Sequence, residues 1–172
     1  MTLRVFGITG WKNSGKTTLT CKLVEEFTRR GFRVSTLKHA HHAFDVDHEG
    51  TDSHRHRQAG AGEVAIMSGR RWAIMHELKD GPEPSMQEML ARLSPCDLVL
   101  VEGYKRESHP KIEVRRQAAL DRTPLPDTGS SIRAIATDHA VDDAEVPVFS
   151  LDDVTAIADM IALETGLGET AA

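Results

Sequence analysis

The sequence predicts an α/β fold with a mostly parallel sheet flanked by helices on both faces. Residues 3–9 and 97–102 are nearly continuous apolar runs, as expected of strands that are covered on both sides. After the first run, Leu19, Leu23 and Phe27 recur every four residues, which is the spacing of a helix with one buried stripe. Strands that alternate with helices in this way indicate parallel strands joined by right-handed crossovers.

Shorter patterns predict the remaining elements. A helix is expected to begin at the capping residue Ser85 and to end before Pro95, and a last helix follows a capping box of Ser150 and Asp153. Two neighbouring strands around a Ser-Gly turn predict a β-hairpin insertion over about 63–77, which would make the sheet mixed. The remaining strands are expected over residues 33–38, 111–116, 132–137 and 146–149.

Length and composition favour one globular domain spanning residues 1–172. The net charge of −5 gives no general attraction to nucleic acid or to an anionic membrane surface. The two cysteines, Cys21 and Cys96, do not form a CxxC pair, which argues against a disulfide framework or a zinc knuckle. With neither an export signal nor a membrane-spanning run in the sequence, we expect a cytoplasmic protein.

Residues 10–17, GWKNSGKT, match the GxxxxGK[ST] pattern of a phosphate-binding loop, between a predicted strand and a predicted helix. The glycines let backbone N–H groups point inward, and the helix N-terminus adds its partial positive charge. Lys16 is placed to reach the β- and γ-phosphates and to act in catalysis, and the Thr17 hydroxyl is placed to coordinate Mg²⁺. The fold is therefore expected to be P-loop NTPase-like. The expected nucleotide-binding residues of the loop are Gly10, Lys12, Asn13, Ser14, Gly15, Lys16, Thr17 and Thr18.

Glu102 ends the apolar run at 97–102, so its carboxylate is expected at the sheet edge where the phosphate loop also lies. There it would support Mg²⁺ together with Thr17. The alternative is a glutamate that is simply solvated at a strand end.

Residues 39–57 form a polar segment without helical or strand periodicity, which predicts a functional loop or lid. Three interpretations stay open: the imidazoles bind Zn²⁺ or Ni²⁺, the segment is a solvated polar loop, or its aspartates help to order Mg²⁺ or the attacking water. Asp47 and Asp52 are our catalytic candidates in the third case. Six of the nine histidines lie here, with three aspartates: His39, His41, His42, His48, His54, His56, Asp45, Asp47 and Asp52.

Several motifs resemble those of the molybdopterin-guanine dinucleotide biosynthesis protein B (MobB) family. The phosphate loop alone is shared by many unrelated proteins, whereas KHxHHxxDxDxxGxDS and VEGYK are far more selective. The motifs are GWKNSGKTTL at 10–19, LKHAHHAFDVDHEGTDS at 37–53, QAGAGE at 58–63, RRWAIMHE at 70–77 and LVLVEGYK at 98–105.

The resemblance implies a GTP-binding adaptor protein with weak intrinsic hydrolysis and Mg²⁺ as its ion. It further implies a homodimer that works beside the MobA-type nucleotidyltransferase, which attaches GMP to molybdopterin to form molybdopterin guanine dinucleotide. Contact with molybdopterin itself is also compatible with this role. Ordering of loops around the γ-phosphate would then change how the partner or the pterin is held.

Guanine-reading relatives of such loops place an aspartate after a late strand, where its oxygens accept the N1 and N2 hydrogens of guanine. Asp138, directly after the strand at 132–137, is the matching candidate. The sequence around it is Ala136-Thr137-Asp138 and departs from the usual Asn-Lys-x-Asp pattern. A surface aspartate is therefore the alternative.

Two competing functions share the phosphate loop. A nickel or zinc metallochaperone GTPase would use the histidines as a delivery site. A small-molecule kinase would need mobile arginines that close over the transferred phosphoryl group, and four arginines keep that class open. They are Arg55, Arg57, Arg70 and Arg71.

Overall fold

The computed structural model describes residues 3–40, 44–126 and 131–168. The chain divides into two compact units. Unit 1 contains residues 1–39 and 92–172, and unit 2 contains residues 40–91. The predicted hairpin insertion lies within unit 2.

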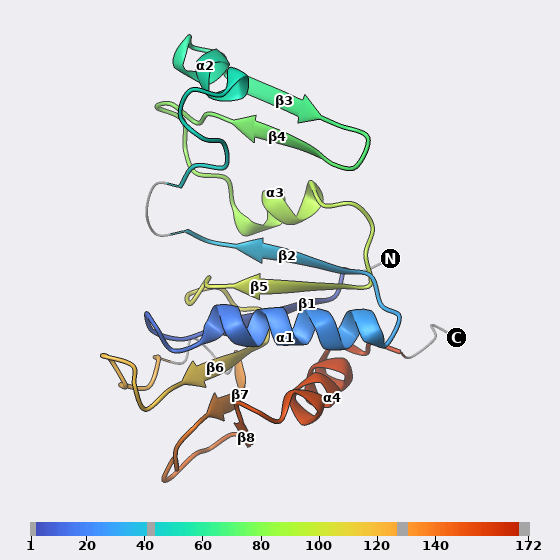
Figure 1. Cartoon of the computed structure of the whole chain (residues 1–172). Helices are drawn as coiled ribbons and strands as arrows, with labels where there is room; N and C mark the ends of the chain where they lie inside the picture. The colour runs from blue at the N-terminus through green and yellow to red at the C-terminus, as the bar shows by residue number, and fades with distance from the viewer. Residues whose placement is uncertain (1–2, 41–43, 127–130, 169–172) are drawn as a thin grey trace. The chain divides into compact units, whose positions relative to one another are not determined.

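Unit 1 is built around a six-stranded sheet of order β2-β5-β1-β6-β7-β8, in which every neighbouring pair is parallel (Figure 1). The predicted α/β class with a parallel sheet is thus confirmed. The expectation of a mixed sheet is wrong, because the hairpin forms a two-stranded sheet of its own. The elements of unit 1 are β1 (Val5–Thr9), α1 (Lys16–Arg29), β2 (Val34–Lys38), β5 (Leu98–Glu102), β6 (Lys111–Arg115), β7 (Ile132–Thr137), β8 (Val148–Ser150) and α4 (Val154–Thr165).

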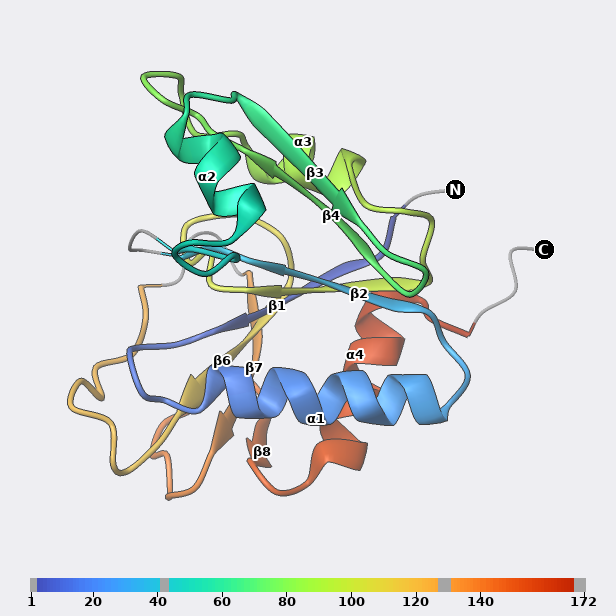
Figure 2. The same cartoon turned by 45° about the horizontal axis from the view of Figure 1, so that its top comes forward.

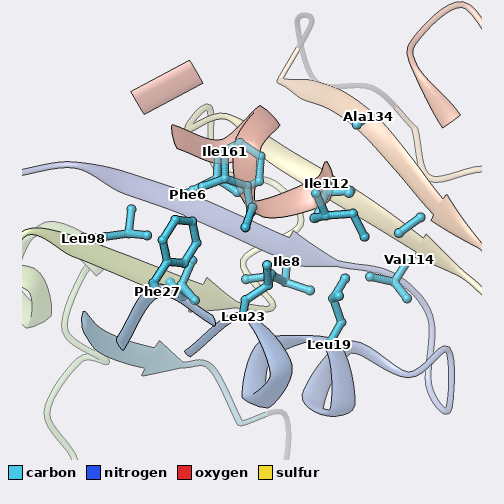
Figure 3. Packing of buried hydrophobic residues seen from close by; sticks show 14 of the residues in the cluster. Phe6, Ile8, Leu19, Leu23, Phe27, Leu98, Ile112, Val114, Ala134 and Ile161 are labelled. Carbon is cyan, nitrogen blue, oxygen red and sulfur yellow. The ribbon is translucent and has the colours of Figure 1, made fainter. Parts of the chain in front are cut away.

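The core of unit 1 lies between the sheet and its two helices (Figure 3). Leu23 and Phe27 of α1 and Ile161 of α4 are fully buried, and each such side chain contributes about 1.5–3 kcal/mol of transfer free energy. Arg30, which follows α1, donates a hydrogen bond of 2.7 Å to Asp159 of α4. The two helices therefore lie side by side on one face of the sheet. Neither of them forms the helical layer that the sequence predicts on the other face.

On the opposite face of the sheet, polar side chains are buried against loops. The Glu113 carboxylate accepts a 3.0 Å hydrogen bond from the Leu125 amide, which fixes the segment after β6 against the sheet. His109 lies directly over Gly7, where a Cβ atom would be 2.5 Å from Nε2, so any other residue would displace the ring. Burial, and to a lesser extent the charge of Lys111, lower the pKa of His109 to about 4.

Unit 2 consists of α2 (Asp52–Gln58), β3 (Glu63–Met67), β4 (Trp72–His76) and α3 (Met86–Ala91). Figure 2 shows the antiparallel β3–β4 hairpin, which confirms the prediction for this part of the chain. Ser85 was the predicted cap of the next helix, and its hydroxyl accepts the Glu88 amide at 3.2 Å while the Glu88 carboxylate accepts the Ser85 amide at 2.7 Å. This reciprocal pair fixes the start of α3.

Two local predictions are wrong. The segment 39–57 is not entirely a loop, because α2 begins inside it with its N-terminus capped by Thr51. The short α2 helix buries only Ser53 among its residues, so it leaves no apolar stripe to be recognised. At the last helix, Asp153 is the N-cap and accepts the Ala156 amide at 3.1 Å, whereas Ser150 still belongs to β8.

None of the helices among the described residues combines the length and the apolar character needed to cross a bilayer.

Candidate functional site

The connection between β1 and α1 adopts a conformation that few residues other than glycine tolerate. Gly10 has φ +148° and Gly15 has φ +96°. A Cβ atom on Gly10 would lie 2.5 Å from the Val114 carbonyl oxygen and 2.6 Å from Ser14 Oγ. Gly15 is the N-cap of α1 and has no side chain to cap the first amides of the helix. Because these N–H groups begin a helix, they form a natural anion site.

Lys16 lies folded back on the phosphate loop. Its Nζ donates a 2.6 Å hydrogen bond to the Trp11 carbonyl oxygen. Burial lowers the pKa of Lys16, the nearby Glu102 carboxylate raises it, and Lys105 and Lys38 lower it further. The charge of the Lys16 ammonium group is thus incompletely balanced by its surroundings, and a phosphate group would balance it.

Thr17 and Glu102 meet at the carboxyl end of the sheet, as the sequence predicts for a magnesium site. The Thr17 hydroxyl donates a 2.8 Å hydrogen bond to Glu102 Oε1. The Glu102 side chain is only 10% exposed, and Lys38 Nζ lies 3.1 Å from the same oxygen. Two adjacent oxygens beside a phosphate loop are the donor set that Mg²⁺ prefers, so these residues fit the ion.

A cleft of about 380 Å³ adjoins this oxygen pair on unit 1. Thr17, Lys38 and Glu102 lie in its wall, together with Val24 of α1 and Leu37 of β2. The carboxylate therefore borders open space on unit 1.

Asp138 follows β7 and is held by the chain around it. Its Oδ1 accepts the Gln117 amide at 2.7 Å and lies 3.1 Å from His139 Nδ1. The Gln117 bond, followed by that of His139, lowers the pKa of the Asp138 carboxyl. Its Oδ2 lies 3.7 Å from Arg116 Nε. The carboxylate is therefore ionised at neutral pH, as a reader of guanine hydrogens must be.

Arg116 lies between Asp138 and the phosphate loop. The sequence analysis did not single out this arginine. Its guanidinium carbon lies 3.4 Å from the position that a Cβ atom on Gly15 would take. Only the three-dimensional neighbourhood of β6 and the loop reveals this contact.

Lys105 lies over the ring of Trp11 in the phosphate loop. Its Nζ is 3.8 Å from the centroid of the Trp11 ring, and the Trp11 indole donates a 2.6 Å hydrogen bond to the Thr123 carbonyl. Burial lowers the pKa of Lys105, while the charge of Asp121 opposes this. A cation is thus held beside the loop by an aromatic ring.

The two remaining catalytic candidates, Asp47 and Asp52, lie in unit 2. Arg57 forms ion pairs with Asp47, with Asp45 at 2.6 Å and with Glu77 at 2.7 Å. The Arg57 hydrogen bond is the largest cause that lowers the pKa of Asp45, to about 2. Asp52 is in the first turn of α2. Asp47 therefore already has a structural partner, which joins the segment before α2 to the end of β4.

The histidines of the polar segment do not assemble a metal centre within the described ranges. No group of three or more His, Cys, Asp or Glu side chains that could hold a metal occurs among the residues that the structure describes. His41 and His42 lie outside those residues.

The sequence matches the family described as molybdopterin guanine dinucleotide synthesis protein B over residues 5–138. The molybdopterin-guanine dinucleotide biosynthesis adapter protein of Haemophilus influenzae is 41% identical over 160 residues, which cover 91% of this chain and 86% of that protein. The adapter protein of the same name in Escherichia coli is 37% identical over 153 residues, covering 88% and 87%. The crystal structure of a MobB protein homolog from Bacillus stearothermophilus has a TM-score of 0.69 at 30% identity and covers 95% of this chain and 99% of that one.

The matched residues begin at the first residue of β1 and end at Asp138, so they include the phosphate loop, Thr17 and Glu102. The resemblance predicted from the sequence motifs is therefore confirmed. This chain belongs to the molybdopterin guanine dinucleotide synthesis protein B (MobB) family.

Proposed function

We propose that this chain is an adapter protein of molybdopterin-guanine dinucleotide biosynthesis that works by binding GTP with Mg²⁺ at the phosphate loop. The observation that carries the nucleotide proposal is the juxtaposition of the glycine-supported loop with the oxygens of Thr17 and Glu102, 2.8 Å apart. The relatives of the chain that bear the adapter name support the pathway.

In this proposal, the loop amides and the start of α1 hold the phosphates, and Lys16 exchanges the Trp11 carbonyl for the β- and γ-phosphates. Thr17 and Glu102 hold Mg²⁺, which neutralises charge on the phosphates. Hydrolysis is weak in this proposal.

The nucleotide proposal is tested with Lys16→Ala. This change removes the ammonium that faces the phosphates, so we expect the affinity for GTP to fall by more than about tenfold. Lys22→Ala removes a partly exposed lysine of the same helix and serves as the matched control, for which GTP affinity stays within about twofold. Isothermal titration calorimetry measures both, with circular dichroism to confirm folding. A folded Lys16→Ala protein that binds GTP as the wild type does would contradict the proposal.

Guanine selectivity is proposed for Asp138. An aspartate accepts two hydrogens from guanine, whereas an asparagine offers one acceptor and one donor and therefore prefers xanthine. Asp138→Asn is expected to weaken GTP binding and to strengthen XTP binding, with ATP weak throughout. If Asp138→Asn changes neither the GTP affinity nor the XTP affinity, Asp138 serves only to hold Gln117 and Arg116.

The partners proposed for the adapter are the MobA-type nucleotidyltransferase, molybdopterin and a second copy of the chain. Unit 2 offers an apolar surface for self-association, since Met67, Trp72 and Ile74 are 82%, 68% and 57% exposed and project from the same side of the hairpin. Light scattering after size exclusion measures the mass of wild type and of Ile74→Asp. A monomeric wild type would exclude the homodimer, and co-purification with the nucleotidyltransferase tests that partner separately.

A further inference from the structure

Lys38 and Glu102 are brought together by the order of the strands. β2 is one of the two edge strands of the sheet, and its last residue, Lys38, is in register with Glu102 of β5. Lys38 Nζ lies 3.1 Å from Glu102 Oε1, the oxygen that also accepts the Thr17 hydroxyl at 2.8 Å. One oxygen of Glu102 thus contacts both the Lys38 ammonium and the hydroxyl of Thr17, the candidate metal ligand.

The two partners of this ion pair differ in how firmly they are held. Glu102 is 10% exposed at its side chain, whereas the Lys38 side chain is 59% exposed and lines the cleft. A nearly buried carboxylate needs a cation beside it. An exposed lysine forms only a weak ion pair and leaves at little cost. A divalent ion at Thr17 would compete with the ammonium for the same oxygen.

We propose that Lys38 is a placeholder cation that neutralises Glu102 in the metal-free protein and is displaced when Mg²⁺ binds beside Thr17. The proposal rests on the proposed function, because it assumes a nucleotide-bound Mg²⁺ at this oxygen pair. It assigns a positioning role to Lys38, which the sequence analysis did not identify as a site residue.

Displacement would act at a particular point of the chain. Lys38 is followed by His39, whose amide donates a 3.1 Å hydrogen bond to the Glu102 carbonyl, and unit 2 begins at Ala40. The released side chain therefore belongs to the last strand residue before the chain leaves unit 1. Arrival of Mg²⁺ would thus move the Lys38 ammonium away from Glu102, shortly before the chain continues into unit 2.

The energetic test compares Lys38→Gln with Lys22→Gln, which removes the same charge from a lysine on α1 that pairs with Asp152 at 3.4 Å. With GDP bound, free Mg²⁺ is titrated and the half-saturating concentration is measured by calorimetry. Because the metal no longer has to expel an ammonium, Lys38→Gln should lower that concentration about two- to fivefold, the range expected for one exposed ion pair. Lys22→Gln should leave it unchanged. An unchanged or higher concentration in Lys38→Gln overturns the proposal.

The structural test is a pair of crystal structures of the wild type, one with GDP and EDTA and one with GDP and Mg²⁺. We expect Lys38 Nζ to stay at Glu102 Oε1 in the first and to leave it in the second. A lysine that keeps this contact beside bound Mg²⁺ overturns the proposal. GDP affinity in EDTA is measured first, so that a chain that binds no nucleotide refutes the proposed function instead. A chain that binds GDP but keeps the Lys38–Glu102 contact beside bound Mg²⁺ refutes the displacement alone.

Discussion

Gly10→Ala should damage the phosphate loop through one added methyl group. At φ +148° an alanine is strained, and its Cβ would lie 2.5 Å from the backbone oxygen of Val114. The left-handed backbone alone costs about 1–2 kcal/mol, and overpacking against a fixed atom adds about 1–3 kcal/mol. We therefore expect the free energy of unfolding to fall by about 2–5 kcal/mol. Gly31→Ala separates the two effects, because Gly31 has φ +89° but no atom within 4 Å of its added Cβ.

Urea unfolding followed by circular dichroism measures the free energy of unfolding of both variants. Calorimetry measures their GTP affinity without urea, at a temperature at which both are folded. Gly31→Ala should lose about 1–2 kcal/mol and bind GTP normally. Gly10→Ala should lose more and bind GTP at least tenfold more weakly, because relief of the clash moves the amides that are proposed to hold phosphate. If the two variants lose equal stability and bind GTP equally well, the close approach of Gly10 to Val114 does not shape the loop.

Three further predictions concern the scaffold. Because burial lowers the pKa of His109 to about 4 from about 6.5 in the unfolded chain, the unfolded state binds more protons between these values. The free energy of unfolding should therefore fall by about 1–2 kcal/mol, after allowing for solvent access, as the pH drops from about 6.5 to about 4. Urea unfolding at several pH values should show a weaker pH dependence for His109→Asn and an unchanged one for the control His56→Gln, at an exposed histidine. Arg57→Leu leaves its carboxylates without their shared cation and should destabilise unit 2, seen as faster amide exchange in α2 and β4. Leu23→Ala should cost about 2–5 kcal/mol, against less than about 0.5 kcal/mol for the exposed Leu163→Ala, both by urea unfolding.

Features encoded by short-range patterns could be predicted from the sequence, and features set by strand order could not. The phosphate loop and α1 were predictable because a glycine motif precedes a helical apolar stripe. The α2 helix was missed because its stability comes from the Thr51 cap and the Arg57 ion pairs instead of an apolar stripe. Lys38 was missed because only the placement of β2 beside β5 brings it to Glu102.

If the proposed function holds, the electrostatics of the site should favour the magnesium nucleotide over either component alone. Lys16, Lys38 and Lys105 surround the loop, and the latter two lower the pKa of Lys16. A nucleotide without metal would satisfy these cations but would leave Glu102 dependent on Lys38. A metal without nucleotide would have to expel Lys38 while the other two ammonium groups still repel it. Only when phosphates neutralise those lysines does a divalent ion gain at Glu102 more than the displaced ammonium loses, so nucleotide and Mg²⁺ should bind with positive coupling.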